Sequence, residues 1–235
     1  MPDRGRLDPL GITAGPLLRG EHAAPWVLGG ARWAQVTFEV GQADALAYLP
    51  EDLTRPVPAY ARILVLDAPE SPAGPFRLAA LLVGGRFRLM PRNMLVEAVV
   101  DGPVQKVAAA FGAPFVNGSI EVQFGRDSMQ ARVSAGGQRL AGIDLHELRA
   151  VDQALLRWDP WLGFAGPGDN IDLVEYRLEP RIEQAWLSKQ TKLEAPGAVE
   201  PESPWRRLRC LNPISSCVCE GTLTLTVPEV LQALV

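Results

Sequence analysis

The sequence predicts a mainly β protein whose antiparallel strands form a closed or nearly closed β-barrel flanked by a few short helices. Apolar residues make up 47% of the 235 residues, while 21 prolines and 22 glycines divide the chain into short elements. Apolar and polar residues alternate along many of these elements, as they do in half-buried strands. About ten such strands would leave unpaired edges exposed unless the sheet closed on itself.

The N-terminal part of the chain is expected to be an arm followed by strands. Residues 1–28 are rich in glycine, proline and charge, so they become ordered only by lying on the body or on a neighbouring subunit. Alternation over 32–40 predicts a strand, and residues 42–49 fit a short helix stopped by Pro50. A meander follows, with Gly84-Gly85 as a hairpin turn. Its strands are expected over 60–66, 76–83, 86–90 and 94–100.

The rest of the chain is predicted to be mostly extended as well. Pro103 suits the first turn of a helix that Gly112 would end. A surface loop is expected over 194–204, and a final helix over 228–234 would close one end of the barrel. The remaining strands are expected over 119–124, 129–135, 138–143, 170–178, 181–191 and 214–227. Since no point separates two cores, residues 29–235 are expected to form a single domain.

Charge and cysteine content exclude several classes of function. The net charge of −4 is small, and the basic residues are scattered, so the footprint of a nucleic-acid-binding protein is absent. No apolar run reaches the ~18 residues of a membrane span, which favours a soluble, cytoplasmic protein. The chain has three cysteines, Cys210, Cys217 and Cys219, and only two histidines, which does not favour a zinc site. We expect the cysteines to pack in the core. No cofactor is predicted.

Four short motifs carry a resemblance to a known family. They are LPEDL in the segment ALAYLPEDL, and GPF, NMLVEAV and FGAPF in the stretch GPFRLAALLVGGRFRLMPRNMLVEAVVDGPVQKVAAAFGAPFVNG. Together they resemble the acetoacetate decarboxylase family, and the order of elements is similar from about Trp26 to Leu234. The resemblance implies a cone-like, mainly antiparallel barrel with a ligand cavity inside. It also suggests a homo-oligomer.

The chain departs from this family at the residues that carry the chemistry. In the family, a Gly-aromatic-Pro-Lys-Lys motif supplies a lysine that forms a Schiff base with a β-keto acid. The matching positions in this chain are Phe115 and Val116. The family's acidic residue after the Gly-Pro-aromatic turn corresponds to Leu78, and its arginine at the start of an early strand corresponds to Arg32. Leu78, Phe115 and Val116 are therefore expected either to line an apolar ligand cavity or to fill it.

Three residues are candidates for binding or catalysis. Arg32 either binds a ligand carboxylate through two parallel hydrogen bonds or is a solvated residue at a strand end. Glu97 is surrounded by apolar residues, so it is either a buried acid with a raised pKa, suited to general acid or base work, or an outward-facing residue. Lys106 is either a relocated amine, reaching the cavity from the helix before FGAPF, or a solvent-facing lysine.

Three functions remain open from the sequence. The first is binding of a small apolar organic acid or ketone in the barrel cavity without classical Schiff-base decarboxylation, with acid/base or cyclisation-type chemistry through Arg32 and Glu97, or none. The second is a β-keto-acid decarboxylase or lyase that uses Lys106. The third is a non-catalytic structural subunit with a filled barrel.

Overall fold

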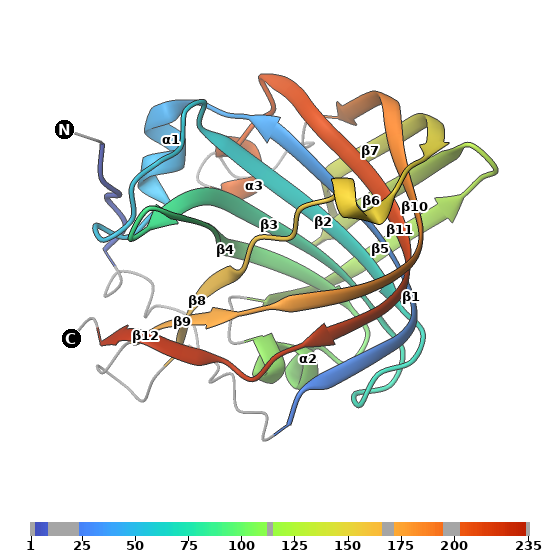
Figure 1. The fold of residues 1–235 in the computed structure, drawn as a ribbon, viewed down its shortest axis with the longest axis horizontal. Coiled ribbons are helices and arrows are strands. Elements are labelled where there is room, and N and C mark those ends of the chain that lie inside the picture. The colour runs from blue at the N-terminus through green and yellow to red at the C-terminus, as the bar shows by residue number, and fades with distance from the viewer. Residues whose placement is uncertain (1–2, 9–23, 112–114, 166–171, 195–202, 234–235) are drawn as a thin grey trace.

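The computed structural model describes residues 3–8, 24–111, 115–165, 172–194 and 203–233. Strands dominate these residues, as predicted (Figure 1). The helices are α1 (Gln42–Ala47), α2 (Val104–Phe111) and α3 (Pro204–Arg207), with a 3-10 turn at Gln153–Leu155. The strands are β1 (Trp26–Glu39), β2 (Tyr60–Ala68), β3 (Phe76–Phe87), β4 (Met90–Asp101), β5 (Phe115–Phe124), β6 (Ser128–Ala135), β7 (Gln138–Ala150), β8 (Trp161–Ala165), β9 (Asp172–Tyr176), β10 (Leu178–Glu194), β11 (Asn212–Leu225) and β12 (Glu229–Ala233).

The described strands form one sheet that closes into a ring. Nine strands follow one another in the order β4-β3-β2-β1-β11-β10-β7-β6-β5. The ring closes where Ala98–Val100 of β4 pairs in parallel with 115–117 of β5, while the other pairings around it are antiparallel. A branch, β8-β9-β12, leaves the ring because β4 also pairs with β8. The prediction of a closed or nearly closed barrel is confirmed.

The ring strands carry apolar side chains on both faces. Val36, Ile63, Leu81 and Val99 belong to the cluster inside the ring. Their neighbours on the opposite face belong to a second cluster, which the branch and α2 cover, and which includes Trp33, Leu66, Leu78, Phe111 and Trp161. The apolar side chains of one sheet therefore form two clusters, which share strands β1–β4. The reason is visible in β3, whose near-continuous apolar run is typical of strands buried on both faces.

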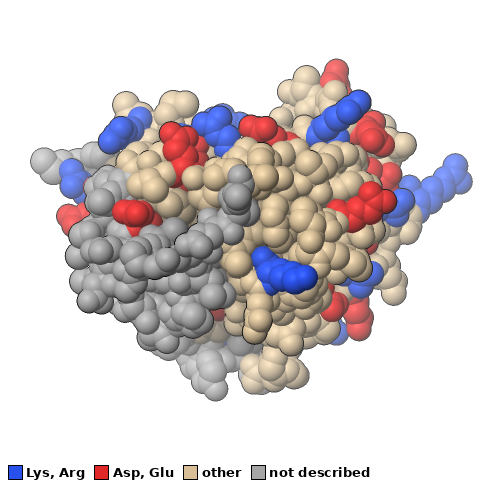
Figure 2. Space-filling model, turned by 90° about the horizontal axis from the view of Figure 1, so that it is seen from below, with Lys and Arg blue, Asp and Glu red and all other residues tan. Residues whose placement is uncertain are grey.

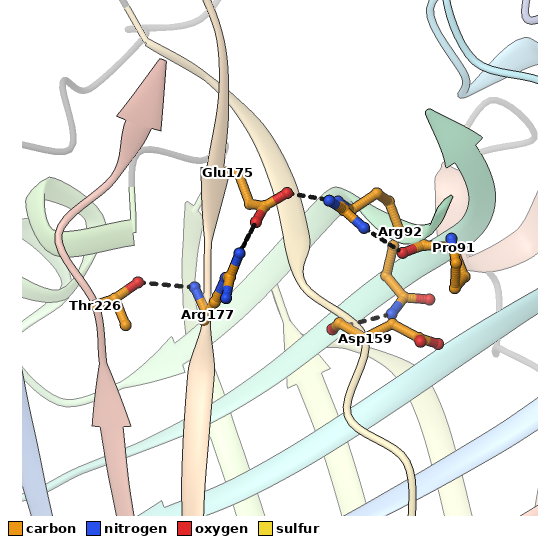
Figure 3. A network of polar contacts seen from close by, with 7 residues as sticks. Pro91, Arg92, Asp159, Glu175, Arg177 and Thr226 are labelled. Atoms are coloured by element: carbon orange, nitrogen blue, oxygen red, sulfur yellow. Dashed lines mark hydrogen bonds and ion pairs between the residues drawn. The ribbon is translucent and has the colours of Figure 1, made fainter. Parts of the chain in front are cut away.

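Buried charges hold the branch against the ring (Figure 3). Glu175 of β9 is 3% exposed and accepts hydrogen bonds from Arg92 of β4 at 2.5 Å and from Arg177 at 3.0 Å. Asn93 of β4 donates to the backbone oxygen of Asp159, just before β8. These contacts tie β4, β9 and the segment before β8 together, so that the outer core stays covered.

Two elements differ from the sequence expectation in kind. Gly84-Gly85 is not a turn: β3 continues through it to Phe87, and the chain reverses at Arg88 and Leu89, both with positive φ. The glycines serve close packing instead, because a Cβ on Gly84 would lie 2.2 Å from the ring of Tyr60. The expected final helix is also wrong, since residues 229–233 form β12 and pair with β9, where they extend the branch.

Other expectations are confirmed, or lie outside the described residues. The predicted helices correspond to α1 and α2, and Cys217 and Cys219 are buried together in the outer core. Of the predicted arm, residues 3–8 lie on the body through bridges of Arg4 with Thr54 and Leu7 with Pro50. Residues 9–23, Gly112 and most of the predicted 194–204 loop are not described. Within the described ranges, no helix is long and apolar enough to cross a membrane.

Charged side chains are interspersed on the face drawn in Figure 2. Blue basic groups and red acidic groups alternate over the described surface without gathering into a single-sign patch. This distribution agrees with the small net charge of −4.

Candidate functional site

The positions that correspond to the family's Schiff-base lysine and acidic residue lie in the outer core. Leu78 of β3 is completely buried there, and Phe115 at the start of β5 packs against the same cluster. The rings of Phe115 and Phe111 are 5.9 Å apart and tilted by 56°, and the ring of Trp161 lies 6.2 Å from that of Phe111. An aromatic side chain therefore packs against the position that the sequence resemblance aligns with the family's lysine.

The other carried-over residues do not join Leu78 and Phe115. Val116 packs against the cluster inside the ring, because successive residues of a strand point to opposite faces. Lys106 is exposed on α2, whose buried residues Val107, Ala110 and Phe111 face the outer core. The predicted site residues are thus divided between the two faces of the sheet and the surface.

Arg32 lies at one end of the ring, already paired. Its Nε lies 2.8 Å from Oε1 of Glu220 on the neighbouring strand β11, and its guanidinium lies 5.2 Å from the ring centroid of Phe124. The side chain is 48% exposed. A ligand carboxylate at this position would have to compete with Glu220.

Glu97 points into the ring and has one specific partner. It lies opposite Leu81 of β3, and its Oε1 accepts a 2.6 Å hydrogen bond from Nε1 of Trp205 on α3. Burial raises the pKa of the Glu97 carboxyl group, and the hydrogen bond from Trp205 opposes that rise without cancelling it. The group therefore holds its proton to a higher pH than an exposed glutamate does.

A cavity of about 170 Å³ lies beside this pair, between α3 and strands β1, β2, β3 and β7. Trp205 and Leu81 belong to its wall, so the Glu97 carboxyl group lies one hydrogen bond behind the lining. Burial raises the pKa of the Cys210 thiol at the edge of the cavity. The lining residues are Phe38, Ile63, Leu81, Leu140, Ala141, Leu193, Glu194, Trp205, Leu208, Arg209 and Cys210.

The sequence indicated Glu97 but missed the element that completes the site. Helix α3 has Pro204 at its first position, after Ser203, which is a recognised start signal for a helix. We had interpreted this stretch as the end of a loop. Only the folded chain brings Trp205 to Glu97, 108 residues away in sequence. The resulting cavity has a mainly apolar wall, to which Glu194 and Arg209 add one charge of each sign, and this suits binding of a small uncharged or weakly acidic molecule.

Comparison with known proteins supports the fold strongly and the sequence family weakly. No family model matches the chain, and no curated protein does. Among solved structures, acetoacetate decarboxylase from Legionella pneumophila has a TM-score of 0.77 at 16% identity, covering 90% of this chain and 89% of that one. An acetoacetate decarboxylase-like enzyme from Sphingomonas wittichii RW1 has a TM-score of 0.75 at 16% identity, covering 92% and 96%.

A third solved structure carries a ligand. The enduracididine biosynthesis enzyme MppR complexed with pyruvate has a TM-score of 0.72 at 18% identity and covers 99% of this chain and 98% of its own. These identities are low, but the coverage is nearly complete in both directions. The chain therefore has the acetoacetate decarboxylase-like fold that its short motifs predicted.

Proposed function

We propose that this chain binds a small apolar organic acid or ketone in the cavity between α3 and the ring, without classical Schiff-base chemistry. The observation that carries the proposal is the apolar cavity of about 170 Å³ beside the Glu97–Trp205 pair. It equals roughly the volume of five or six water molecules in the liquid. A ligand of only a few carbon atoms fits that space.

Glu97 is proposed to act as a positioning residue. Its carboxyl group accepts the indole N–H of Trp205 and thereby holds that ring in the wall of the cavity. Because burial favours the protonated form, the pair does not require an uncompensated charge next to the apolar lining. The MppR neighbour, complexed with pyruvate, supports a small organic acid as a ligand for this fold.

A thermal-shift panel of short ketones and acids tests the proposal. Acetylacetone, 2-butanone and butyrate are added to the wild-type chain and to Ala141→Leu, which fills the cavity with a larger side chain. At least one compound should raise the melting temperature of the wild type, since a ligand that binds the folded state stabilises it, and Ala141→Leu should abolish the shift. The surface variant Ala154→Leu is the matched control. Indifference of the wild type to all three compounds would contradict the proposal.

A non-catalytic structural subunit is the second candidate. The packing of Leu78, Phe111 and Phe115 in the outer core favours it, since apolar side chains pack against the position that the resemblance aligns with the lysine. The lyase alternative receives no support from the exposed position of Lys106 on α2. Incubation with acetoacetate, reduction with borohydride and intact-mass measurement distinguish it: a chain without Schiff-base chemistry keeps its mass, whereas a lyase acting through Lys106 gains an adduct there.

A further inference from the structure

A second hollow lies on the face of β1 and β2 that points away from the ring interior. It is a groove of about 600 Å³. Gln35 and Thr37 of β1 and Tyr60 and Arg62 of β2 form its floor, and they alternate with the residues that face the ring interior. Leu155, Leu156, Arg157 and Asp159 form one wall, and residues 214–217 form another. This groove is separate from the cavity at Trp205.

A much smaller cavity of about 10 Å³ adjoins the groove, with Gln35 and Asp159 in the lining of both. Such a volume holds about one water molecule or one ligand oxygen. Trp33 and Trp158 line it, with ring centroids 5.9 Å apart and an interplanar angle of 70°. The small cavity therefore lies between two indole rings.

Three N–H donors in this region are buried without an acceptor among the described residues. They are Nε1 of Trp33, Nε1 of Trp158 and Nε of Arg62. Trp33 is 0% exposed, so water at the surface does not satisfy it. A buried donor without a partner costs about 1–3 kcal/mol, so these three N–H groups need acceptors that the described residues do not supply.

The charge of the groove favours an anion. Its lining includes three arginines, Arg62, Arg86 and Arg157, and one acidic residue, Asp159. Asp159 is neutralised from two sides, since its carboxylate lies 3.1 Å from Arg62 and 2.8 Å from Arg157. Counting these four residues, the groove has two positive charges in excess.

The rim of the groove is apolar. Val57, Leu155 and Ile214 line it with 82%, 72% and 50% of their surfaces exposed. Large aliphatic side chains exposed around a hollow usually mark a binding surface for an apolar group. The groove thus combines a positively charged interior that offers N–H donors with an apolar rim.

We propose that this groove binds an apolar monocarboxylic acid in its anionic form. The carboxylate lies in the groove beside Arg62, with one oxygen directed into the small cavity toward the indole N–H groups of Trp33 and Trp158, and the hydrocarbon tail lies along Val57, Leu155 and Ile214. A carboxylate accepts about four hydrogen bonds and donates none, which matches three unpartnered donors. A neutral ketone or an amine does not meet that requirement. The assignment is independent of the ligand proposed for the cavity at Trp205.

Calorimetric titration with octanoate, octanol and octylamine tests this inference. The wild type should bind octanoate with a Kd below about 1 mM, octanol at least tenfold more weakly, and octylamine not at all. Trp33→Phe and Trp158→Phe each keep an aromatic ring but remove one donor, and each should weaken octanoate binding about fivefold to tenfold. Arg62→Lys removes the Nε donor while leaving Asp159 a positive partner.

Two controls separate this site from the cavity at Trp205. Trp186→Phe removes an indole N–H outside the groove and should leave octanoate affinity unchanged. Ala141→Leu, which fills the cavity at Trp205, should do the same. Absence of octanoate binding to the wild type, equal binding of octylamine, or octanoate binding that is unchanged in Trp33→Phe, Trp158→Phe and Arg62→Lys would overturn the assignment. Loss of octanoate binding in Ala141→Leu would place it in the other cavity.

Discussion

Two residues, Phe115 and Glu97, bear most directly on the proposed function. Phe115 is the position that the sequence resemblance aligns with a Schiff-base lysine, and its ring packs against Phe111 in the outer core. Glu97, by contrast, accepts a hydrogen bond from Trp205 inside the ring, and burial raises the pKa of the Glu97 carboxyl group. Phe115 is thus packed among apolar side chains, while Glu97, which directly precedes the residue of β4 that pairs with Phe115, retains an ionisable group next to a cavity.

The raised pKa of Glu97 predicts a specific dependence of stability on pH. Below its ordinary value of 4.5, the folded and unfolded chains both hold the proton, so the favourable contribution of the protonated carboxyl group is fully present. As the pH rises, the unfolded chain releases the proton first, and this contribution is lost up to the folded pKa. The wild type should therefore lose stability relative to Glu97→Gln as the pH rises above about 4.5, as urea denaturation measures. A stability difference that stays constant with pH would contradict the raised pKa.

Phe115 is predicted to contribute to stability. Phe115→Ala removes a ring from the outer core and should lower the free energy of unfolding by about 3 kcal/mol, the lower end of the range for buried aromatic residues because Phe115 is only partly buried. Urea denaturation provides the measurement. Lys106→Ala is the control, since an exposed side chain should change stability by less than about 0.5 kcal/mol. Equal effects of the two variants would contradict the packing described for Phe115.

At the scale of elements, the closure of the ring depends on a close approach between strands. The junction is the parallel pairing of β4 with β5, and β5 then continues along β6. Gly118 lies in this junction, where an added Cβ would be 2.2 Å from the backbone oxygen of Ser134 and 2.5 Å from Val99. The absence of a side chain at this position lets the three strands meet.

Gly118→Ala should therefore weaken ring closure. The extra methyl group forces β5 away from β6 or from β4, and overpacking of this kind costs about 2 kcal/mol. A lower midpoint of thermal unfolding, compared with the neighbouring exposed variant Ser119→Ala, is the expected result. If Gly118→Ala and Ser119→Ala melt at the same temperature, the junction does not need the glycine.

At the scale of the whole molecule, one sheet separates two cores. Strands β1–β4 supply side chains to the ring interior from one face and to the outer core from the other. The two cores therefore share their backbone, and loss of either one exposes the other. The cavity at Trp205 and the groove at Arg62 lie on opposite faces of β1 and β2.

This shared backbone predicts a single unfolding transition. Near-ultraviolet circular dichroism reports aromatic packing in both cores, and far-ultraviolet circular dichroism reports the strands. Their midpoints in urea should coincide, since neither core can persist without β1–β4. Two separated midpoints would indicate that the branch β8-β9-β12 and its core unfold independently of the ring.

The sequence alone predicted where most of the strands and helices lie. It also showed directly that Phe115, and not a lysine, follows Gly112-Ala113-Pro114. Alternation of apolar and polar residues located most strands, and short motifs led to the acetoacetate decarboxylase-like fold. A pattern with a period of two gives alternate faces but does not tell which face is the interior, so Glu97 and Val116 could not be separated in advance from Leu78 and Phe115. The pairing of Glu97 with Trp205, and the packing of Trp33 against Trp158, depended on the tertiary structure, because contacts across so many residues arise only when the closed sheet fixes the register of its strands.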